Sequence, residues 1–447
     1  MGLLALAFSA AAQSSANAQE PRTHTGPFKT TLDYVVNFYP LWFTYFQSLQ
    51  ATHNRLVGPE TVTPVYKIVV AINVDTLYAS TFLNLEAEPV IITIPDTPVH
   101  YSILTLDPFG DIFPTDLKAG KPGTYALTGP EFTGRIPRRV KRIAIPLDVS
   151  VLIFRIDRSL NGKDVTNTAD EFRRSITMQT LSDYKSGKPP AATLILPVEA
   201  FSISYKRIAD EMIAVRPITF LKLLQEAVAA PNTPPLSARE QALSDRFNAL
   251  FGDGSFDSET EALDFRAGAR AAHQLIVDRY LTFRGRTNWI HFTNIGNWRR
   301  HVVDRAAITE FIQYGNGIKT AAYYHAFLDR RGRPLDGTDR RGYIFNIPKS
   351  KIPEADRFWS ITAYTPDTVE LVRNKARKYV VASYTKNLQH NADGSISIYL
   401  ARELPKGAPE ANWLPVPRGP FNIMLRVYGP EGSVADNTYV PPGIRKR

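Results

Sequence analysis

The chain has 447 residues and a formal net charge of +10, with 44% hydrophobic and 21% charged residues. This balance excludes a globally disordered chain, and the length is enough for two or three domains, each with its own apolar core. Cysteine is absent, which excludes a disulfide framework, a thiol nucleophile and a thiolate metal site. Basic runs at 138–142, 330–333 and 445–447 indicate a solvated cationic surface or an anionic partner. The sequence has no nucleic-acid motif, so we expect no nucleic-acid partner.

The first residues have the pattern of a secretory signal peptide. An apolar run over 2–8 is followed by small residues, and Ala16-Asn17-Ala18 fits a signal-peptidase site. The run is too short to span a bilayer, although the usual basic residue after Met1 is missing. We predict a signal peptide at 1–18, a mature chain that begins at Gln19, and a periplasmic or secreted protein. No later segment is long and apolar enough to be transmembrane.

The pattern of the chain then changes from helical to β-rich. Residues 31–51 carry apolar residues at mixed spacing and predict a helix interrupted at Pro40. Short β-branched runs separated by Pro, Gly and Asp follow, and they predict an antiparallel sandwich or barrel. The runs lie at 65–72, 89–95, 99–106, 123–127, 142–146 and 151–156.

Helices are expected in the middle of the chain and strands near its end. Capping-box sequences at 168–171 and 237–240 predict helices that reach Tyr184 and Gly252. Two more helices are expected at 258–280 and 302–328. The later strands are expected at 343–347, 358–364, 379–383, 395–400 and 421–428, with a tight turn at 391–394.

This order of elements predicts an α+β protein. Two antiparallel domains of β-sandwich or jelly-roll type would be joined by a helical middle segment. The expected divisions are an N-terminal β-rich domain at 31–160, the helical segment at 165–328 and a C-terminal β-sandwich at 329–445.

The signatures of common catalytic classes are missing. The sequence has no Gly-x-Ser-x-Gly elbow, no P-loop, no His-Glu-x-x-His and no dinucleotide-binding glycine motif. The eight histidines never occur at metal-ligand spacing, and His325 is expected to be a packed or surface residue. We therefore expect no organic cofactor and assign no metal residues, although residues distant in sequence could still form a metal site.

A first group of polar residues follows the run at 65–72. It consists of Asn73, Asp75, Thr76 and Tyr78, with Tyr101 on a later strand. In a structural interpretation, the Asp and Thr side chains cap backbone N–H groups of a turn. In a functional interpretation, Asp75 is an acid or base, and Tyr78 and Tyr101 are donors around a polar ligand.

A second polar group lies in the last hundred residues. Its members are Trp359, Tyr364, Asn374, Asn412, Trp413, Arg426 and Tyr428. They form either a sandwich core in which Arg426 pairs with a carboxylate, or a cavity in which ligand satisfies the polar groups. We assign catalytic roles to Asp75, Tyr101, Tyr364 and Arg426. We assign substrate binding to Asn73, Tyr78, Trp359, Asn412, Trp413 and Tyr428, and expect both groups to converge on one cavity.

These residues resemble a known pair of domains. The sequences around Asn73-x-Asp75-Thr76-Leu77-Tyr78, Pro89-Val90 and His100-Tyr101 look like the N-terminal domain of unknown function 1254. The later sequences look like its partner, the domain of unknown function 1214; they include Leu335-Asp336-Gly337, Phe358-Trp359-Ser360, Asp393-Gly394-Ser395, Asn412-Trp413-Leu414-Pro415, Arg426 and Tyr428-x-Pro430. The resemblance covers about 35–445. It implies a two-domain, β-sandwich-rich protein that is often exported and often oligomeric, and it implies no catalytic assignment.

Three functions are consistent with the sequence. The first is a cofactor-independent hydrolase or lyase that acts on a small polar or sugar-like molecule in a cavity between the β-rich domains. The second is a binding protein for a carbohydrate or envelope polymer, in which Trp359 and Trp413 stack on sugar rings. The third is a structural homo-oligomer of the cell envelope whose interior is filled.

Overall fold

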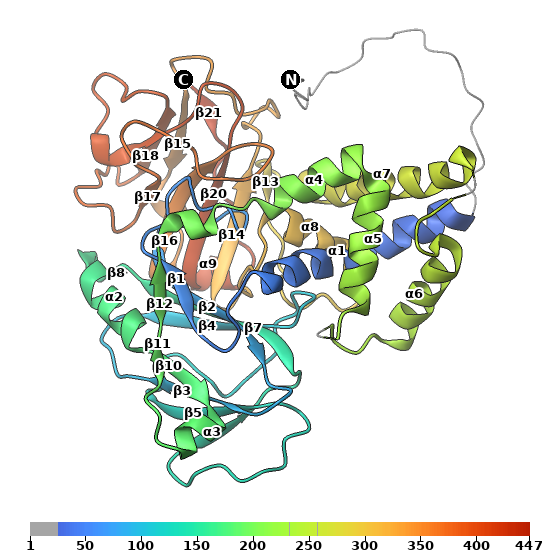
Figure 1. The fold of residues 1–447 in the computed structure, drawn as a ribbon. Helices are drawn as coiled ribbons and strands as arrows, with labels where there is room; N and C mark the ends of the chain where they lie inside the picture. The colour runs from blue at the N-terminus through green and yellow to red at the C-terminus, as the bar shows by residue number, and fades with distance from the viewer. Residues whose placement is uncertain (1–25, 232, 257) are drawn as a thin grey trace.

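The computed structural model describes residues 26–231, 233–256 and 258–447. The predicted signal peptide and its cleavage site lie outside these residues. Figure 1 shows three units that meet at the centre: an N-terminal β-sandwich below, a C-terminal β-sandwich at the upper left and a bundle of helices on the right. The protein is therefore α+β, as predicted. No helix within the described ranges combines the length and the apolar character that a membrane span requires.

The N-terminal sandwich consists of two five-stranded sheets. The first contains, in spatial order, β12 (Leu194–Leu196), β1 (Val57–Pro59), β2 (Thr76–Asn84), β7 (Val149–Asp157) and β4 (Tyr101–Leu106). The second contains β11 (Ala191–Ala192), β10 (Thr177–Thr180), β3 (Val90–Ile94), β5 (Gly123–Thr128) and β6 (Lys141–Ala144). Leu77 and Phe154 of the first sheet pack against Ile92 and Leu127 of the second, which closes an apolar core between the sheets.

The C-terminal sandwich has a five-stranded and a four-stranded sheet. The larger contains β13 (Trp289–Ile290), β14 (Ala321–Ala326), β20 (Asn422–Pro430), β16 (Ala355–Tyr364) and β17 (Val380–Ala382). The smaller contains β19 (Trp413–Pro415), β18 (Ile396–Ala401), β15 (Tyr343–Ile347) and β21 (Arg445–Lys446). Their shared core includes Trp359, Ile361, Phe345 and Val427.

The first helix is the centre of the helical bundle. Helix α1 (Gly26–Leu49) packs against four helices from the middle of the chain, namely α5 (Pro217–Ala229), α6 (Ala238–Phe251), α7 (Glu259–Thr282) and α8 (Val302–Phe311). Helix α4 (Tyr205–Val215) packs on α5 and α7. The predicted capping box is present at the start of α6, where Ser237 and Glu240 bond each other's backbone N–H groups. Pro40 lies inside α1 without ending it.

Several predicted elements are wrong, and in each case burial explains the error. The run at 65–72 is apolar because it borders a central cavity, and the strand lies instead at β2. The helix expected at 302–328 ends at Phe311, and the last part forms β14. Both faces of β14 are buried, so its sequence lacks the alternation that identifies a half-buried strand.

The unit boundaries also differ from the predicted ones. The helix expected at 168–184 is split into α2 (Thr166–Ser175), β10 and α3 (Leu181–Lys185), and the start of α2 has no side-chain cap. Strands β10 to β12 complete the N-terminal sheets, while β13 and β14 belong to the C-terminal sandwich. The helical unit therefore combines α1 with the helices between residues 205 and 311.

Candidate functional site

Two sheets face each other at the centre, and each presents polar side chains there. Because successive strand residues point to opposite faces, Tyr428 of β20 joins the central cluster while Val427 joins the C-terminal core. In β7, Ile153 joins the central cluster while Phe154 joins the N-terminal core. Arg155 lies two residues after Ile153 in the same strand, so its side chain points to the same face and towards the centre.

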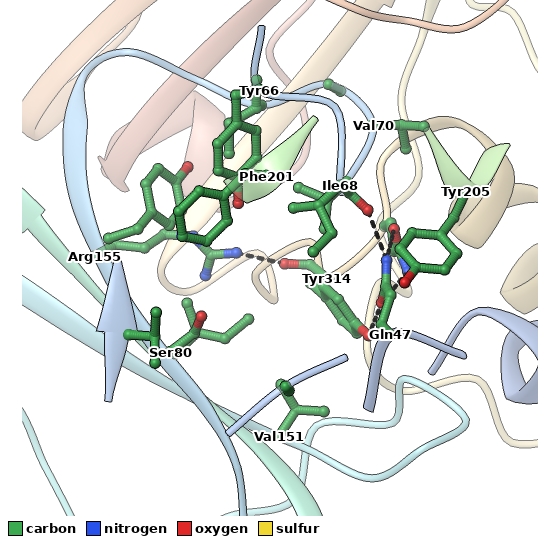
Figure 2. A pocket seen from close by; sticks show the side chains of 18 of the residues that line it. Gln47, Tyr66, Ile68, Val70, Ser80, Val151, Arg155, Phe201, Tyr205 and Tyr314 are labelled. Atoms are coloured by element: carbon green, nitrogen blue, oxygen red, sulfur yellow. Dashed lines mark hydrogen bonds between the residues drawn. The ribbon is translucent and has the colours of Figure 1, made fainter. Parts of the chain in front are cut away.

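A cavity of about 250 Å³ lies where the three units meet (Figure 2). Its lining includes Gln47 of α1, Tyr78 of β2, Arg155 of β7 and Arg426 of β20. The segments at 66–73 and 312–315 supply further walls. Ligand sites often form at domain interfaces, and this one is slightly smaller than the roughly 300–1,000 Å³ of drug-sized pockets. The cavity therefore fits a small ligand.

Arg155 is a buried cation with neutral partners. Its guanidinium donates to the side-chain oxygen of Asn316 at 3.0 Å and to the backbone carbonyl of Tyr314 at 2.7 Å, the second of which is drawn in Figure 2. The guanidinium also lies 5.7 Å from the centre of the Tyr78 ring. Within the described part of the chain, Arg155 forms no ion pair.

Arg426 is a second buried cation beside the cavity. Its Nη2 donates to the backbone carbonyl of Ala71, and its guanidinium lies 5.5 Å from the centre of the Tyr364 ring. Its Nη1 is buried without a hydrogen-bond partner among the described residues. Burial raises the pKa of Tyr364 to about 12, with Arg426 opposing the rise, so this neighbour is neutral at pH 7. Asp75 acts on Arg426 electrostatically but forms no ion pair with it.

Two tyrosine hydroxyl groups add further donors to the cavity. Tyr66 and Tyr78 both line it, and neither hydroxyl has a hydrogen-bond partner within the part of the chain that is described. Burial raises the pKa of Tyr66 well above its ordinary value, so this phenol keeps its proton at neutral pH. Arg155, Arg426 and the two phenols are all donors, which is the set that an oxyanion would satisfy.

The opposite wall carries a neutral hydrogen-bond network, visible in Figure 2. The Nε2 of Gln47 donates to the backbone carbonyl of Ile68 at 2.7 Å. The Oε1 of Gln47 accepts from the Tyr314 hydroxyl at 2.6 Å and from the Gln313 amide at 3.1 Å. These bonds join α1 to the segment after α8 within one wall of the cavity.

Backbone strain is concentrated around the same cavity. Ala71 and Tyr314 line it with φ values of 50° and 56°. Val369, whose carbonyl accepts from the Ala71 N–H at 3.0 Å, has a φ of 51°. This conformation is unusual for residues other than glycine and is rare for a β-branched side chain. Such strain commonly marks ligand sites that the surrounding fold holds in place.

The Asn73–Thr76 turn connects the two sandwiches. The Oδ1 of Asn73 accepts from the backbone N–H groups of Asp75 at 3.0 Å and Thr76 at 3.2 Å, while its Nδ2 donates to the Tyr428 hydroxyl at 2.5 Å. The structure thus contains the turn capping that the structural interpretation expected, although Asn73 makes the cap. Asn73 also borders the cavity.

Asp75 lies in the domain interface and is not among the residues that line the cavity. Its carboxylate accepts from the Ser360 hydroxyl at 2.7 Å and from the Tyr384 hydroxyl at 2.5 Å. Burial raises its pKa, and the two hydroxyl groups oppose that rise. Asp75 therefore holds the C-terminal sheet against the N-terminal turn.

The structure does not bring the remaining predicted site residues to this cavity. Tyr101 packs against Phe172 within the N-terminal sandwich, and Trp359 lies in the C-terminal core. Asn412 caps the backbone near Gln389, and the indole N–H of Trp413 donates to the Ala401 carbonyl, both within the C-terminal sandwich. The predicted convergence of all these residues on one cavity is therefore wrong. Tyr364 lies next to it, because its hydroxyl donates to the Ile72 carbonyl at 2.7 Å.

Sequence reasoning missed several residues that line the cavity, chiefly Tyr66, Arg155 and Tyr314. The only available signal was strand parity. Arg155 follows the apolar run 151–154 of β7, and it shares a face with Val151 and Ile153 rather than with the core residues between them. A charged residue at such a position indicates a polar contact on that face. Tyr66 and Tyr314 lie in irregular segments, where no periodic pattern assigns a side chain to a face.

One cluster in the helical bundle has the residue types of a metal site. Ligand atoms of Asp210, His273 and Glu310 lie within 4.8 Å of one another. However, the Lys206 ammonium contacts both carboxylates, at 2.9 Å in the case of Asp210. The Tyr39 hydroxyl donates to Glu310 at 2.5 Å. A metal would have to displace the ammonium, so the cluster fits an internal charge network better than a metal centre.

His325 is packed, as one of the predicted alternatives stated. The Nδ2 of Asn422 donates to the backbone carbonyl of Thr365, which leaves the Oδ1 of Asn422 as an acceptor. This Oδ1 accepts from the Nε2 of His325 at 2.6 Å. The Nδ1 of His325 then accepts from the Tyr280 hydroxyl at 2.7 Å. Burial lowers the pKa of His325 to about 3, so it is neutral at pH 7. Its ring nitrogens are both engaged within the fold.

Comparisons with known proteins place two domains on the chain. The family described as Protein of unknown function (DUF1254) matches residues 53–180, and the family described as Protein of unknown function (DUF1214) matches residues 320–432. No curated protein matches the chain.

Two solved structures are similar over most of the chain. The VPA0106 protein from Vibrio parahaemolyticus has a TM-score of 0.60 and 19% identity, with 94% of this chain and 99% of that chain covered. This level of identity supports the fold alone. A putative uncharacterized protein from Burkholderia cenocepacia has a TM-score of 0.44 and 14% identity, with 94% of each chain covered.

Proposed function

The chain belongs to the two-domain family that joins DUF1254 to DUF1214, and from this premise we propose that it binds a small anionic molecule in the central cavity. The observation that carries the proposal is the buried Nη1 of Arg426, which borders the cavity without a partner. Arg155, with neutral partners only, adds a second positive charge to the same lining.

A charged group buried in a protein loses the hydration that stabilises it in water. A buried cation without a counter-charge is strongly unfavourable, and proteins normally pair such groups. A carboxylate or phosphate group in the cavity would accept from the guanidinium groups and from the free hydroxyl groups of Tyr66 and Tyr78. Charge-assisted hydrogen bonds of this kind are about twice as strong as neutral ones.

If the protein is an enzyme, we propose that it converts the bound anion by a hydrolase or lyase reaction. In that case, Arg155 and Arg426 would stabilise developing negative charge, and the protonated phenol of Tyr66 would donate a proton. Among the described lining residues, none is a carboxylate or a histidine. Arginine and tyrosine side chains of the lining would therefore take the catalytic roles that the sequence analysis assigned to Asp75 and Tyr101.

The alternative of glycan binding used Trp359 and Trp413 as stacking surfaces. Both indoles are buried within the C-terminal sandwich, with exposed fractions of 3% and 9%. A buried ring cannot stack on a sugar without repacking the core. The alternative of a filled structural core is less favoured because a cavity of about 250 Å³ lies where the units meet.

The test compares anions with neutral analogues of the same shape. Titration calorimetry with a panel of monocarboxylates and their amides should show binding of the acids alone. Arg155→Gln and Arg426→Gln should each weaken binding at least about tenfold, because a hydrogen bond to a charged group contributes roughly 1.5–3 kcal/mol. Arg341→Gln is the matched control, because Arg341 is exposed and pairs with Asp339. Equal binding of acids and amides, or unchanged affinity in both cavity variants, would refute the proposal.

We also propose that the protein is exported and that it forms a homo-oligomer. Mass spectrometry of the protein from its own host should find a mature chain that begins at Gln19, and an intact Met1 would contradict export by this signal. Sedimentation of the purified protein would decide whether it forms a homo-oligomer.

A further inference from the structure

The floor of the cavity changes from polar to apolar along two paired strands. Tyr78 of β2 pairs with Arg155 of β7, and Phe82 pairs with Val151 four residues away. All four residues line the cavity. At about 3.3 Å per strand residue, the polar and apolar pairs are separated by about 13 Å. Between them, Ile153 adds a further apolar side chain.

One wall beside this floor, opposite the Gln47 network, is also apolar. Tyr66 and Phe201 stack with ring centres 5.3 Å apart and an angle of 15° between the planes. Ile68 and Val70 lie beyond them along the same segment, and Figure 2 shows these side chains around the space between Arg155 and Gln47. Together they offer a long apolar surface with a single charged end.

The cavity opens beside its apolar end. The backbone carbonyl of Thr52, an exposed lining residue, accepts from the Thr81 hydroxyl at 3.4 Å, which places it next to Phe82. Ile203 also lines the cavity and is 41% exposed.

We infer that the ligand is a single-headed amphiphile of the acyl carboxylate class. This inference rests on the proposed function and specifies its ligand. The carboxylate binds between Arg155, Arg426 and the hydroxyl groups of Tyr66 and Tyr78. The acyl chain follows Ile153 towards Val151 and Phe82, so that the head is enclosed and the tail points to the opening. A floor of about 13 Å suits a medium-length chain.

The experiment is a titration series with straight-chain carboxylates from butanoate to dodecanoate, using the intact protein. Each added methylene should tighten binding about three- to fourfold until the chain fills the cavity, since burial of one methylene contributes about 0.8 kcal/mol. Affinity should then stop increasing near octanoate or decanoate. Gluconate and octanol are the comparison ligands, because gluconate keeps the carboxylate on a polar chain and octanol keeps the chain without the charge.

The results test the apolar tail and the anionic head of the ligand separately. Octanoate binding much more tightly than both comparison ligands supports the amphiphile. Gluconate binding at least as tightly as octanoate overturns the apolar tail but leaves the anion proposal intact. Octanol binding as tightly as octanoate overturns the anionic head, and with it the proposed function. An affinity that does not depend on chain length also overturns the inference.

A variant in the floor provides a second measurement. Ser80 lines the cavity and pairs with Ile153, in the middle of the gradient. Ser80→Leu should fill part of the tail region and shift the preferred chain to a shorter acid, such as hexanoate. Ser80→Ala is the control at the same position and should keep the wild-type preference. An unchanged preference in a folded Ser80→Leu protein would contradict the assigned path of the chain.

Discussion

Lys206 in the helical bundle and Arg426 beside the central cavity are both buried cations, and they differ in how their charge is balanced. In the helical bundle, Lys206 contacts the carboxylates of Glu310 and Asp210, and His273 lies 3.2 Å from Asp210. Beside the central cavity, Arg426 has a carbonyl partner and an unpartnered Nη1. Both cations are almost fully buried, so burial alone does not distinguish a structural charge from a functional one.

The difference lies in what is available to neutralise each charge. The bundle supplies its own counter-charges, Asp210 from α4 and Glu310 from α8, so a ligand has little to add there. The cavity surrounds Arg155 and Arg426 with neutral groups and leaves space beside them. A self-neutralised cluster should matter for stability, whereas an unbalanced cation next to a cavity should matter for binding.

The largest expected effect is on the self-neutralised cluster. Lys206→Met should lower the free energy of unfolding by about 3–5 kcal/mol, because it leaves the buried Glu310 without its cation. Urea denaturation measures the change. Lys188→Met is the control, since Lys188 pairs with Asp183 at the surface, where solvent screens the pair and its contribution to stability is small. Equal losses of stability in the two variants would show that the buried cluster around Lys206 contributes no more than a surface ion pair.

The same cluster should make stability depend on pH. Burial lowers the pKa of His273, but hydrogen bonds and charge from Asp210 and Glu310 outweigh it and raise the pKa to about 9. A raised pKa contributes stability that is fully present below the ordinary value of about 6.5 and is lost as the pH rises through about 9. The contribution is on the order of 3 kcal/mol.

Unfolding measured across this range should show stability falling with rising pH in the wild-type protein. His273→Gln should flatten the profile because it removes the titrating group. An identical profile in the variant would assign the pH dependence to other residues and would contradict the charge balance proposed for the cluster.

The sequence predicted the strands of the C-terminal sandwich more successfully than the site between the units. Segments such as β16 and β20 are rich in β-branched and aromatic residues, and they were placed correctly. The start of α6 was placed by its capping box. In contrast, the predicted site combined Trp359 and Tyr428, which the register places on opposite faces of one sheet.

The reason is that a single sequence specifies local conformation but not which sheet faces meet. Arg155 and Arg426 are far apart in the chain and reach one cavity only because two sandwiches and α1 pack together. Strand parity could have separated Trp359 from Tyr364, both on β16, since residues of opposite parity within one strand point to opposite faces. The partner face, however, depends on tertiary packing that no local pattern describes.

A smaller effect is expected at the turn that connects the sandwiches. Asn73→Ala should cost about 1–2 kcal/mol, because it removes the cap of two backbone N–H groups and the bond to Tyr428. A double-mutant cycle with Tyr428→Phe should give a coupling of about 0.5–1.5 kcal/mol. Additive effects would show that the bond between the sandwiches contributes nothing to stability.

The smallest effect on stability, and the sharpest test of the comparison, is expected at Arg426. Arg426→Gln removes a buried charge together with its desolvation cost, and the shorter amide can still donate a hydrogen bond. We expect the free energy of unfolding to stay within about 1 kcal/mol of wild type, because replacing a buried charge by a neutral group is often close to neutral. Ligand binding should be lost in the same variant.

Asp75 acts on Arg426 electrostatically from the domain interface, so its share in balancing the charge of Arg426 is measured separately. If Asp75 were the true counter-ion, Arg426→Gln would leave its carboxylate unbalanced and would cost about 3–5 kcal/mol. The cycle of Arg426→Gln with Asp75→Asn separates the cases. A coupling below about 1 kcal/mol is expected, because the carboxylate of Asp75 is held by Ser360 and Tyr384. A coupling of about 3 kcal/mol would instead show that Asp75 neutralises Arg426, as Glu310 and Asp210 neutralise Lys206. Arg155 would then be the only cation among the described lining residues that still supports an anionic ligand.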